Sequence, residues 1–79
     1  MPGSVRAFIR DIADDDLRRT INLAIIGLAD DPLPPDARVF RVDGEEIEGA
    51  YELDVDLVTV FYTVHGEHVA IQAITWRIL

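Results

Sequence analysis

The chain has 79 residues, of which 49% are hydrophobic, and its formal net charge is −8. This length allows one domain with a small core, and the apolar content argues against a disordered chain. The absence of cysteine excludes disulfides, thiolate metal sites and cysteine nucleophiles.

The N-terminal residues predict a short amphipathic helix. Its apolar residues recur at i, i+3, i+4 and i+7, which is the spacing of one helical face. They are Val5, Phe8, Ile9 and Ile12. Ser4 is a suitable N-cap for this helix. The aspartates at 14–16 then predict the start of a second helix, because one can cap it and the others favour its positive end. A carboxylate metal cluster is the alternative, but it lacks partners at a known spacing.

A second helix is predicted from Asp16 to about Ala29. Its main apolar face consists of Leu17, Ile21, Ala24, Ile25 and Leu28. Leu23 and Ile26 lie on the flank of this face, so we expect a broad apolar surface and the more buried of the two helices. Pro32 ends the helix, since the residue before a proline avoids the helical region. The short polar connection between the helices predicts an antiparallel helical hairpin.

After the paired prolines at 34–35, the spacing of apolar residues changes from about every 3.6 residues toward every second residue, which predicts strands. The expected elements are a strand over 38–42, a turn over 43–46, a half-buried strand around 51–56, a central strand over 57–64, a hairpin turn over 65–68 and a last strand from 69 to about 76. The fold class is therefore α+β. We expect residues 1–79 to form a single domain, with the helical hairpin packed on a three- to four-stranded antiparallel sheet.

Acidic charge is concentrated in the second half of the chain. Residues 1–41 hold six arginines and seven acids, whereas residues 42–79 hold only Arg77 against eight acids. Such a field repels phosphate backbones, so binding of free nucleic acid is not expected. The longest apolar run, 23–29, is far shorter than the ~20 residues of a membrane span, and the N-terminus lacks a signal-peptide apolar region. We therefore expect a cytoplasmic protein without membrane contact.

Two histidines and two aromatic residues are weaker candidates for functional groups. His65 and His68 have the spacing of a metal or acid–base pair, but they flank a predicted tight turn without a third ligand. An exposed pair is the preferred interpretation, and no metal or cofactor is predicted. Tyr62 and Trp76 are interpreted as aromatic residues that pack on the sheet rather than as stacking platforms.

A succession of motifs carries a resemblance to a known family. The helix end LADDP is followed by PPDARVF, then by the tyrosine-led strand YELDVDLVTVFYTV, and finally by GEHVAIQAITWR. In order and spacing this run, from Val5 to Arg77, resembles the RelE/ParE toxin superfamily of bacterial toxin–antitoxin systems. The resemblance implies a strand, a helical hairpin and an antiparallel three-stranded meander. The first of these strands is missing from this sequence.

The resemblance also implies site residues. Members similar to RelE cut messenger RNA on the ribosome, which requires positive groups for the developing phosphorane charge and a group that moves protons. Arg41 and Arg77 occupy residual catalytic positions of the family, and Arg38 and Tyr62 are the candidate binding residues. The sequence departs from the family at Glu52 and Asp54, which stand where basic residues are usual, and at Thr59, which replaces an arginine. The C-terminal residues that often include a functional tyrosine are absent.

Three functional interpretations follow, and we favour the first. In the first, the chain is a toxin-like member of the family that it resembles, lacks efficient ribonuclease activity and acts by protein–protein binding, because its carboxylates would repel the scissile phosphate. The second is an active ribosome-dependent mRNA interferase that uses Arg38, Arg41 and Arg77, which makes the protein an endoribonuclease. The third is an acidic interaction or regulatory module on the same fold, which binds a basic surface by charge complementarity.

The implied partners follow from the same observations. An antitoxin-like protein is the first expectation, whereas the ribosome and DNA gyrase are implied only by the family resemblance. A sheet without the family's first strand leaves strand edges open, and open edges pair with other chains. We therefore also expect a homodimer, or an extended partner segment, at a sheet edge.

Overall fold

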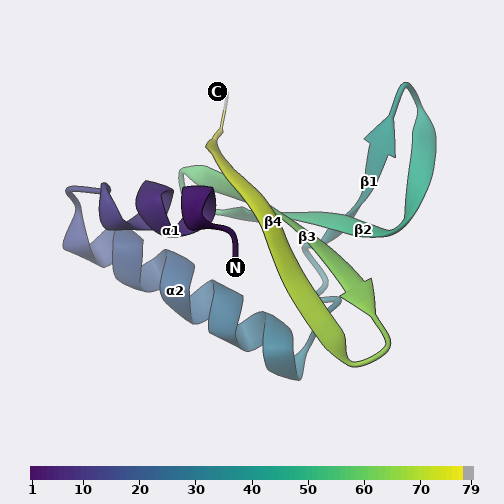
Figure 1. The fold of residues 1–79 in the computed structure, drawn as a ribbon, viewed down its shortest axis with the longest axis horizontal. Helices are drawn as coiled ribbons and strands as arrows, with labels where there is room; N and C mark the ends of the chain where they lie inside the picture. Colours follow the sequence, from purple (N-terminus) through teal and green to yellow (C-terminus); the bar gives the residue numbers. More distant parts are fainter. Residues whose placement is uncertain (78–79) are drawn as a thin grey trace.

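The protein combines a helical hairpin with one antiparallel sheet in a computed structural model that describes residues 1–77. Its elements are α1 (Gly3–Arg10), α2 (Asp15–Asp30), β1 (Arg38–Val42), β2 (Glu45–Val55), β3 (Val58–His65) and β4 (His68–Trp76). The strands form a meander in the order β1-β2-β3-β4, and both helices lie on the same side of it (Figure 1). The predicted α+β class and the helical hairpin on an antiparallel sheet are confirmed, with four strands present.

The two helices begin in different ways. At α2 the Asp14 carboxylate accepts hydrogen bonds from the backbone N–H groups of Asp16, at 2.9 Å, and Leu17, at 3.2 Å. The capping role predicted for the aspartates at 14–16 is therefore confirmed. At α1 the predicted N-cap is wrong, because Ser4 lies inside the helix. The helix begins earlier since the Pro2 carbonyl already accepts from the N–H of Val5, at 3.1 Å.

The core lies between the helices and the sheet. Its most buried side chains are Val5, Ile21, Leu28, Val58, Val60 and Tyr62. Three of these come from β3, which confirms that β3 is the central strand of the core. The Tyr62 hydroxyl donates a hydrogen bond of 2.7 Å to the Pro32 carbonyl, which ties the sheet to the connector after α2. Burial raises the pKa of Tyr62, so the phenol stays protonated as a donor.

Helix α2 has the broad apolar surface that the sequence predicts, but it buries only one face of that surface. Leu23 and Ile26 are 62% and 64% exposed. They lie two residues after Ile21 and Ala24, which face the core. Two residues rotate an α-helix by about 200°, so the two side chains point away from the sheet. The sequence contains two apolar stripes on this helix, and the fold covers only one of them.

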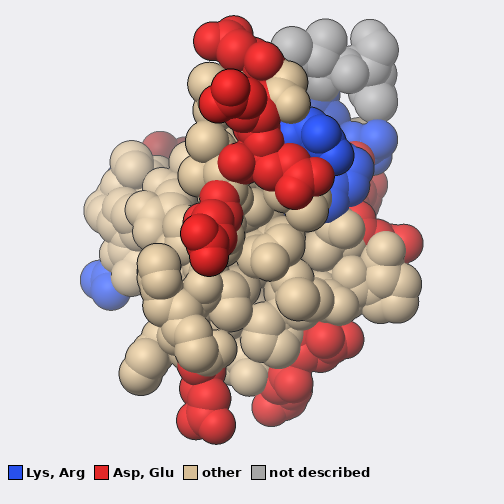
Figure 2. All heavy atoms as spheres, turned by 90° about the vertical axis from the view of Figure 1, so that its right-hand side faces the viewer, with Lys and Arg blue, Asp and Glu red and all other residues tan. Residues whose placement is uncertain are grey.

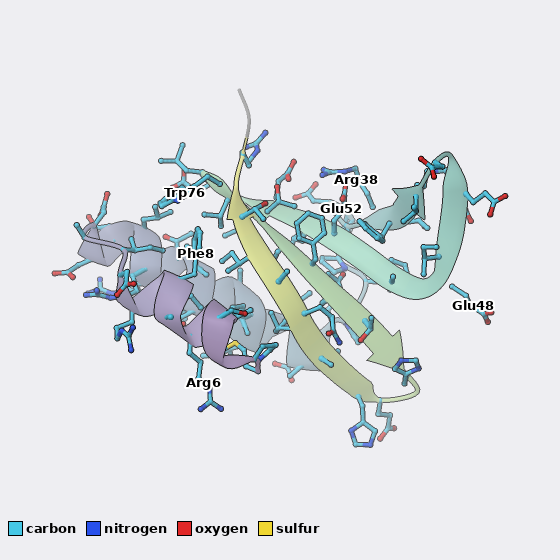
Figure 3. The ribbon with its side chains drawn as sticks, turned by 45° about the horizontal axis from the view of Figure 1, so that its top comes forward. Arg6, Phe8, Arg38, Glu48, Glu52 and Trp76 are labelled. Carbon is cyan, nitrogen blue, oxygen red and sulfur yellow. The ribbon has the colours of Figure 1, made fainter. Side chains whose placement is uncertain are left out.

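Trp76, at the end of β4, packs over α1. Its ring centroid lies 5.1 Å from that of Phe8, and the two side chains meet between the helix and the sheet (Figure 3). The indole nevertheless remains 53% exposed. This contact agrees with the packing role that the sequence predicts. None of the helices within residues 1–77 has both the length and the apolar character needed to cross a membrane.

The β1–β2 hairpin bends out of the plane of the sheet. Val39 pairs with Tyr51 but Arg41 pairs with Glu46, so Phe40 alone faces residues 47–50 of β2. Gly49 within this bulge has a φ of 75°, which glycine adopts without strain. The tip of the hairpin rises away from the other strands (Figure 1). The sequence pattern predicts a strand around 51–56, whereas β2 already begins at Glu45. The first half of β2 bends away from the plane of the sheet with β1.

Candidate functional site

The face of the sheet turned away from the helices is uncovered. Its side chains alternate along the strands with the core residues, as the period of a strand requires. Glu52 pairs with Phe61, and Asp54 pairs with Thr59. Two features meet on this open face, because Glu52 belongs to a group of charged residues and Phe61 to a group of apolar ones. Together they form the candidate functional site.

The first feature is an ion-pair cluster of Arg38, Glu52, Asp54, Thr59 and Arg77. The Arg38 guanidinium binds Asp54 in a bidentate manner, with N–O distances of 2.9 and 3.1 Å. Its Nε donates to Glu52 at 3.0 Å. Figure 3 shows Arg38 and Glu52 pointing toward each other from β1 and β2. Every nitrogen of the Arg38 guanidinium is thus directed at a carboxylate of this chain.

Asp54 is the centre of the ion-pair cluster. In addition to Arg38 it accepts a hydrogen bond of 2.7 Å from the Thr59 hydroxyl, and the Arg77 guanidinium lies 3.7 Å away. The hydrogen bond from Arg38 is the main reason that the pKa of Asp54 falls to about 2. The same contact raises the pKa of Arg38 above its ordinary value. The pair is therefore fully ionised at neutral pH, and each charge offsets the other.

The sheet arginines predicted for catalysis also have acceptors within the chain. Arg41 lies three positions after Arg38 on β1, hence on the other side of the strand, where it pairs with Glu46 at 2.9 Å. Arg77 donates a hydrogen bond of 2.9 Å to the Asp56 carbonyl and has Asp54 nearby. The structure thus brings Arg38 and Arg77 together at Asp54, but it places Arg41 apart from them on the hairpin.

Tyr62, the other predicted binding residue, belongs to the core. It is 1% exposed, and its ring lies 5.8 Å from that of Tyr51. The hydroxyl is already bonded to the Pro32 carbonyl. This placement agrees with the packing interpretation of Tyr62, and the ring also forms part of the lining of the apolar hollow described next.

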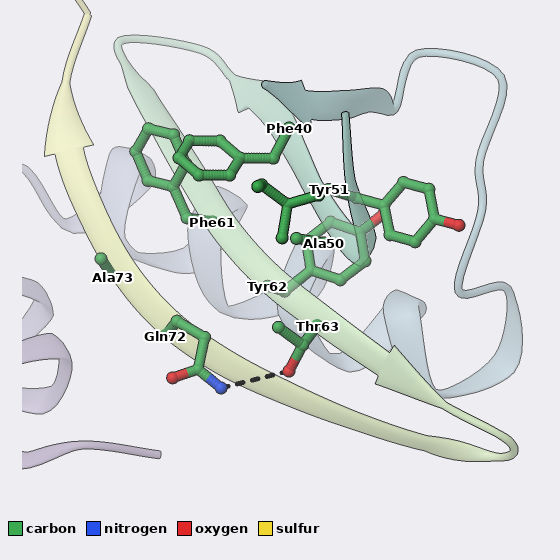
Figure 4. A pocket seen from close by; sticks show the side chains of 9 residues that line it. Phe40, Ala50, Tyr51, Phe61, Tyr62, Thr63, Gln72 and Ala73 are labelled. Carbon is green, nitrogen blue, oxygen red and sulfur yellow. Dashed lines mark hydrogen bonds between the residues drawn. The ribbon is translucent and has the colours of Figure 1, made fainter. Parts of the chain in front are cut away.

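The second feature is an apolar hollow of about 400 Å³ beside the ion-pair cluster. Its lining comprises Phe40, Ile47, Ala50, Tyr51, Phe61, Tyr62, Thr63, Gln72 and Ala73. The rings of Phe40 and Phe61 meet edge to face at 5.6 Å (Figure 4). The polar ends of Thr63 and Gln72 bond to each other at 3.1 Å. Small side chains at Ala50 and Ala73 leave the space that larger residues would fill.

Sequence reasoning missed the apolar hollow. Phe40 and Ile47 reach it only because the bulge in β2 bends the hairpin over the sheet. Ala73 is opposite Phe61 only through the register of β3 with β4. The available signal was the small size of Ala50 and Ala73, but Ala70 on β4 gives the same signal without lining the hollow. That signal is too weak to locate a site without the strand register.

The bent hairpin beside the hollow carries four exposed acids, Asp43, Glu45, Glu46 and Glu48, which we call the acidic rim. None of them lines the hollow itself. Figure 2 shows carboxylates gathered over the raised hairpin, a neighbouring group of arginine atoms, and a mostly uncharged surface below them. A ligand that entered the hollow would therefore approach through a negative field.

The histidine pair carries no metal site in the part of the chain that the structure describes. His65 and His68 face each other across the β3–β4 turn, and both are exposed. Among residues 1–77 no group of three or more histidine, cysteine or acidic side chains could hold a metal ion. The interpretation of these histidines as an exposed pair agrees with this placement.

The fold and the open face define an acidic α+β protein whose uncovered sheet combines neutralised charges with an apolar hollow. Comparison of the chain with protein-family models, curated proteins and solved structures finds no match. Its function is therefore inferred from the geometry of this face.

Proposed function

We propose that this chain is a cytoplasmic, RelE/ParE-like toxin-family protein that binds another protein through its open sheet face and has no efficient ribonuclease activity. The observation that carries the proposal is the apolar hollow beside Arg38, whose guanidinium already binds two carboxylates. The partner is a segment with a large apolar side chain for the hollow and basic residues for its acidic rim. The family resemblance makes an antitoxin-like protein the first candidate for that partner.

The chemistry of RNA cleavage argues against an enzyme at this site. The phosphorane that forms during attack by the ribose 2′-hydroxyl needs uncompensated positive charge and preorganised donors. Arg38 directs its donors at Glu52 and Asp54 instead. A phosphate placed beside this cluster would also meet the charge of two carboxylates. Binding without chemistry is the function that this arrangement supports.

The apolar hollow supplies the affinity that a binding surface needs. Burying one leucine or phenylalanine side chain contributes roughly 1.5–3 kcal/mol, which corresponds to roughly 10- to 100-fold in affinity. Aromatic residues in partly desolvated pockets are typical anchors of protein interfaces. The acidic rim adds orientation and a faster encounter with a basic partner, in the way that complementary charges do.

The test is a selection of peptides whose binding depends on the hollow. A random-peptide phage library is selected on the wild-type protein, and the enriched peptides are then measured on an Ala73→Arg variant, in which a long cationic side chain occupies the hollow. We expect the enriched peptides to combine a large apolar residue with several lysines or arginines. Their affinity for Ala73→Arg should be at least about 10-fold lower than for wild type.

A matched variant controls for the added charge. Ala29→Arg makes the same substitution at an exposed position on α2, remote from the sheet face, and should retain wild-type affinity. Thermal melts of both variants report whether they stay folded. Acidic consensus peptides, peptides that bind Ala73→Arg as tightly as wild type, or a failure to enrich any peptide would overturn the proposal.

A further inference from the structure

The outer face of α2 carries a second surface, separate from the open sheet face. It consists of Arg19, Leu23, Ile26 and Asp30, at the spacing i, i+4, i+7 and i+11, which we call the outer stripe. All four side chains are exposed. They follow the core residues Leu17, Ile21, Ala24 and Leu28 by two positions each, so they point directly away from the core.

The outer stripe is self-complementary when it is read in opposite directions. Leu23 and Ile26 lie equally far from its midpoint, and so do Arg19 and Asp30. Two copies of α2 packed antiparallel about a twofold axis would therefore place Leu23 against Ile26 of the partner subunit. The same register would place Arg19 against Asp30 of the partner subunit. An isologous interface requires this kind of surface, because each patch must match itself.

Within the described residues, both ends of the outer stripe lack ion-pair partners. Among residues 1–77 neither Arg19 nor Asp30 takes part in an ion pair. Gly27 lies beside the stripe in the last turn of α2, and glycine within a helix weakens it by up to about 1 kcal/mol relative to alanine. A Cβ at Gly27 would meet nothing within 4 Å, so packing inside the chain does not account for the glycine. Its missing side chain leaves room for a neighbouring helix.

From this pattern we propose that two copies of the chain associate through antiparallel packing of their α2 helices along the outer stripe. Helix α2 has 16 residues and hence a length of about 24 Å, so the contact is small compared with standard interfaces. The dimer is accordingly weak, with a dissociation constant of about 100 µM. This surface is distinct from the sheet edges and leaves the apolar hollow free for its ligand.

A charge exchange between two variants tests both the contact and its register. Arg19→Asp gives a chain with two acids at the ends of the stripe, and Asp30→Arg gives a chain with two arginines. Each variant alone would bring like charges together twice, so its self-association should be at least about 10-fold weaker than that of wild type. In an equimolar mixture both ion pairs can form again. We expect the mixture to recover wild-type dimerisation as a heterodimer.

Sedimentation equilibrium between about 10 µM and about 1 mM measures these associations. Recovery in the mixture also shows that both variants are folded, since a misfolded chain could not restore the interface. A wild-type protein that stays monomeric at the highest concentration would overturn the proposal. Single variants that dimerise as well as wild type would also overturn it, and this is the result expected for a dimer formed through a sheet edge. A mixture that does not recover wild-type dimerisation would overturn it as well.

Discussion

Ile21→Ala is expected to lower the free energy of unfolding by about 3 kcal/mol, which is a large part of the stability of so small a domain. Ile21 is 0% exposed and lies at the centre of the contact between α2 and the sheet. Alanine removes the apolar contacts of the longer side chain and leaves a cavity that the surrounding residues fill only in part. The melting temperature should fall by about 15 °C.

Ile26→Ala is the matched control, because it makes the same substitution on the same helix. Ile26 is 64% exposed, and its loss should change the free energy of unfolding by less than about 0.5 kcal/mol. Urea titrations at about 10 µM protein keep the chain monomeric while both variants are compared with wild type. Equal losses for the two variants would contradict the one-sided burial of α2.

Arg38→Ala is expected to lower the free energy of unfolding by about 1–2 kcal/mol at neutral pH. It removes a bidentate contact with Asp54 and a hydrogen bond with Glu52, and it leaves two carboxylates close together. The expected loss is moderate because the Arg38 side chain is 50% exposed, so water screens the pair. Arg41→Ala removes an exposed pair with Glu46 and should cost less than about 0.5 kcal/mol, which makes it the control.

The effect of Arg38→Ala should depend on pH in a defined direction. The pKa of Asp54 is lowered from an ordinary value of 3.8 to about 2, so the folded state holds its carboxylate ionised where the unfolded state is protonated. The pair therefore contributes its full stability above about pH 4 and loses it as the pH falls through about 2. Urea titrations should show the difference between wild type and Arg38→Ala shrinking across this interval. A difference that is unchanged at about pH 2 would contradict the role of Asp54.

The parts of the fold that follow from local chemistry are predictable from the sequence. The Asp14 cap, the end of α2 near Pro32 and the β1 boundaries at Arg38 and Val42 depend on neighbouring residues. The exposure of Leu23 and Ile26 does not depend on neighbouring residues in the sequence. It depends on how much of the helix surface the sheet can cover. Two apolar stripes on one helix look alike in sequence, and only the tertiary packing distinguishes them.

The candidate site was predictable only in its chemistry. The sequence shows Glu52 and Asp54 two positions apart on one predicted strand, but it does not show what neutralises them. That role belongs to Arg38, which reaches them through the β1–β2 register. The apolar hollow depends on the same register together with the bulge at residues 47–50. Contacts between distant strands, and not the side chains alone, create both features.

We propose that acceptors within this chain engage the arginines of the sheet, so that the open face binds a partner and does not cleave RNA. The most direct measurement is messenger RNA cleavage in a bacterial translation extract, mapped by primer extension. Wild-type protein is compared with an Arg41→Ala/Arg77→Ala double variant. We predict no cleavage by either protein, even when the protein equals the ribosomes in concentration. Cleavage by wild type that the double variant loses would contradict the claim and establish an active ribonuclease.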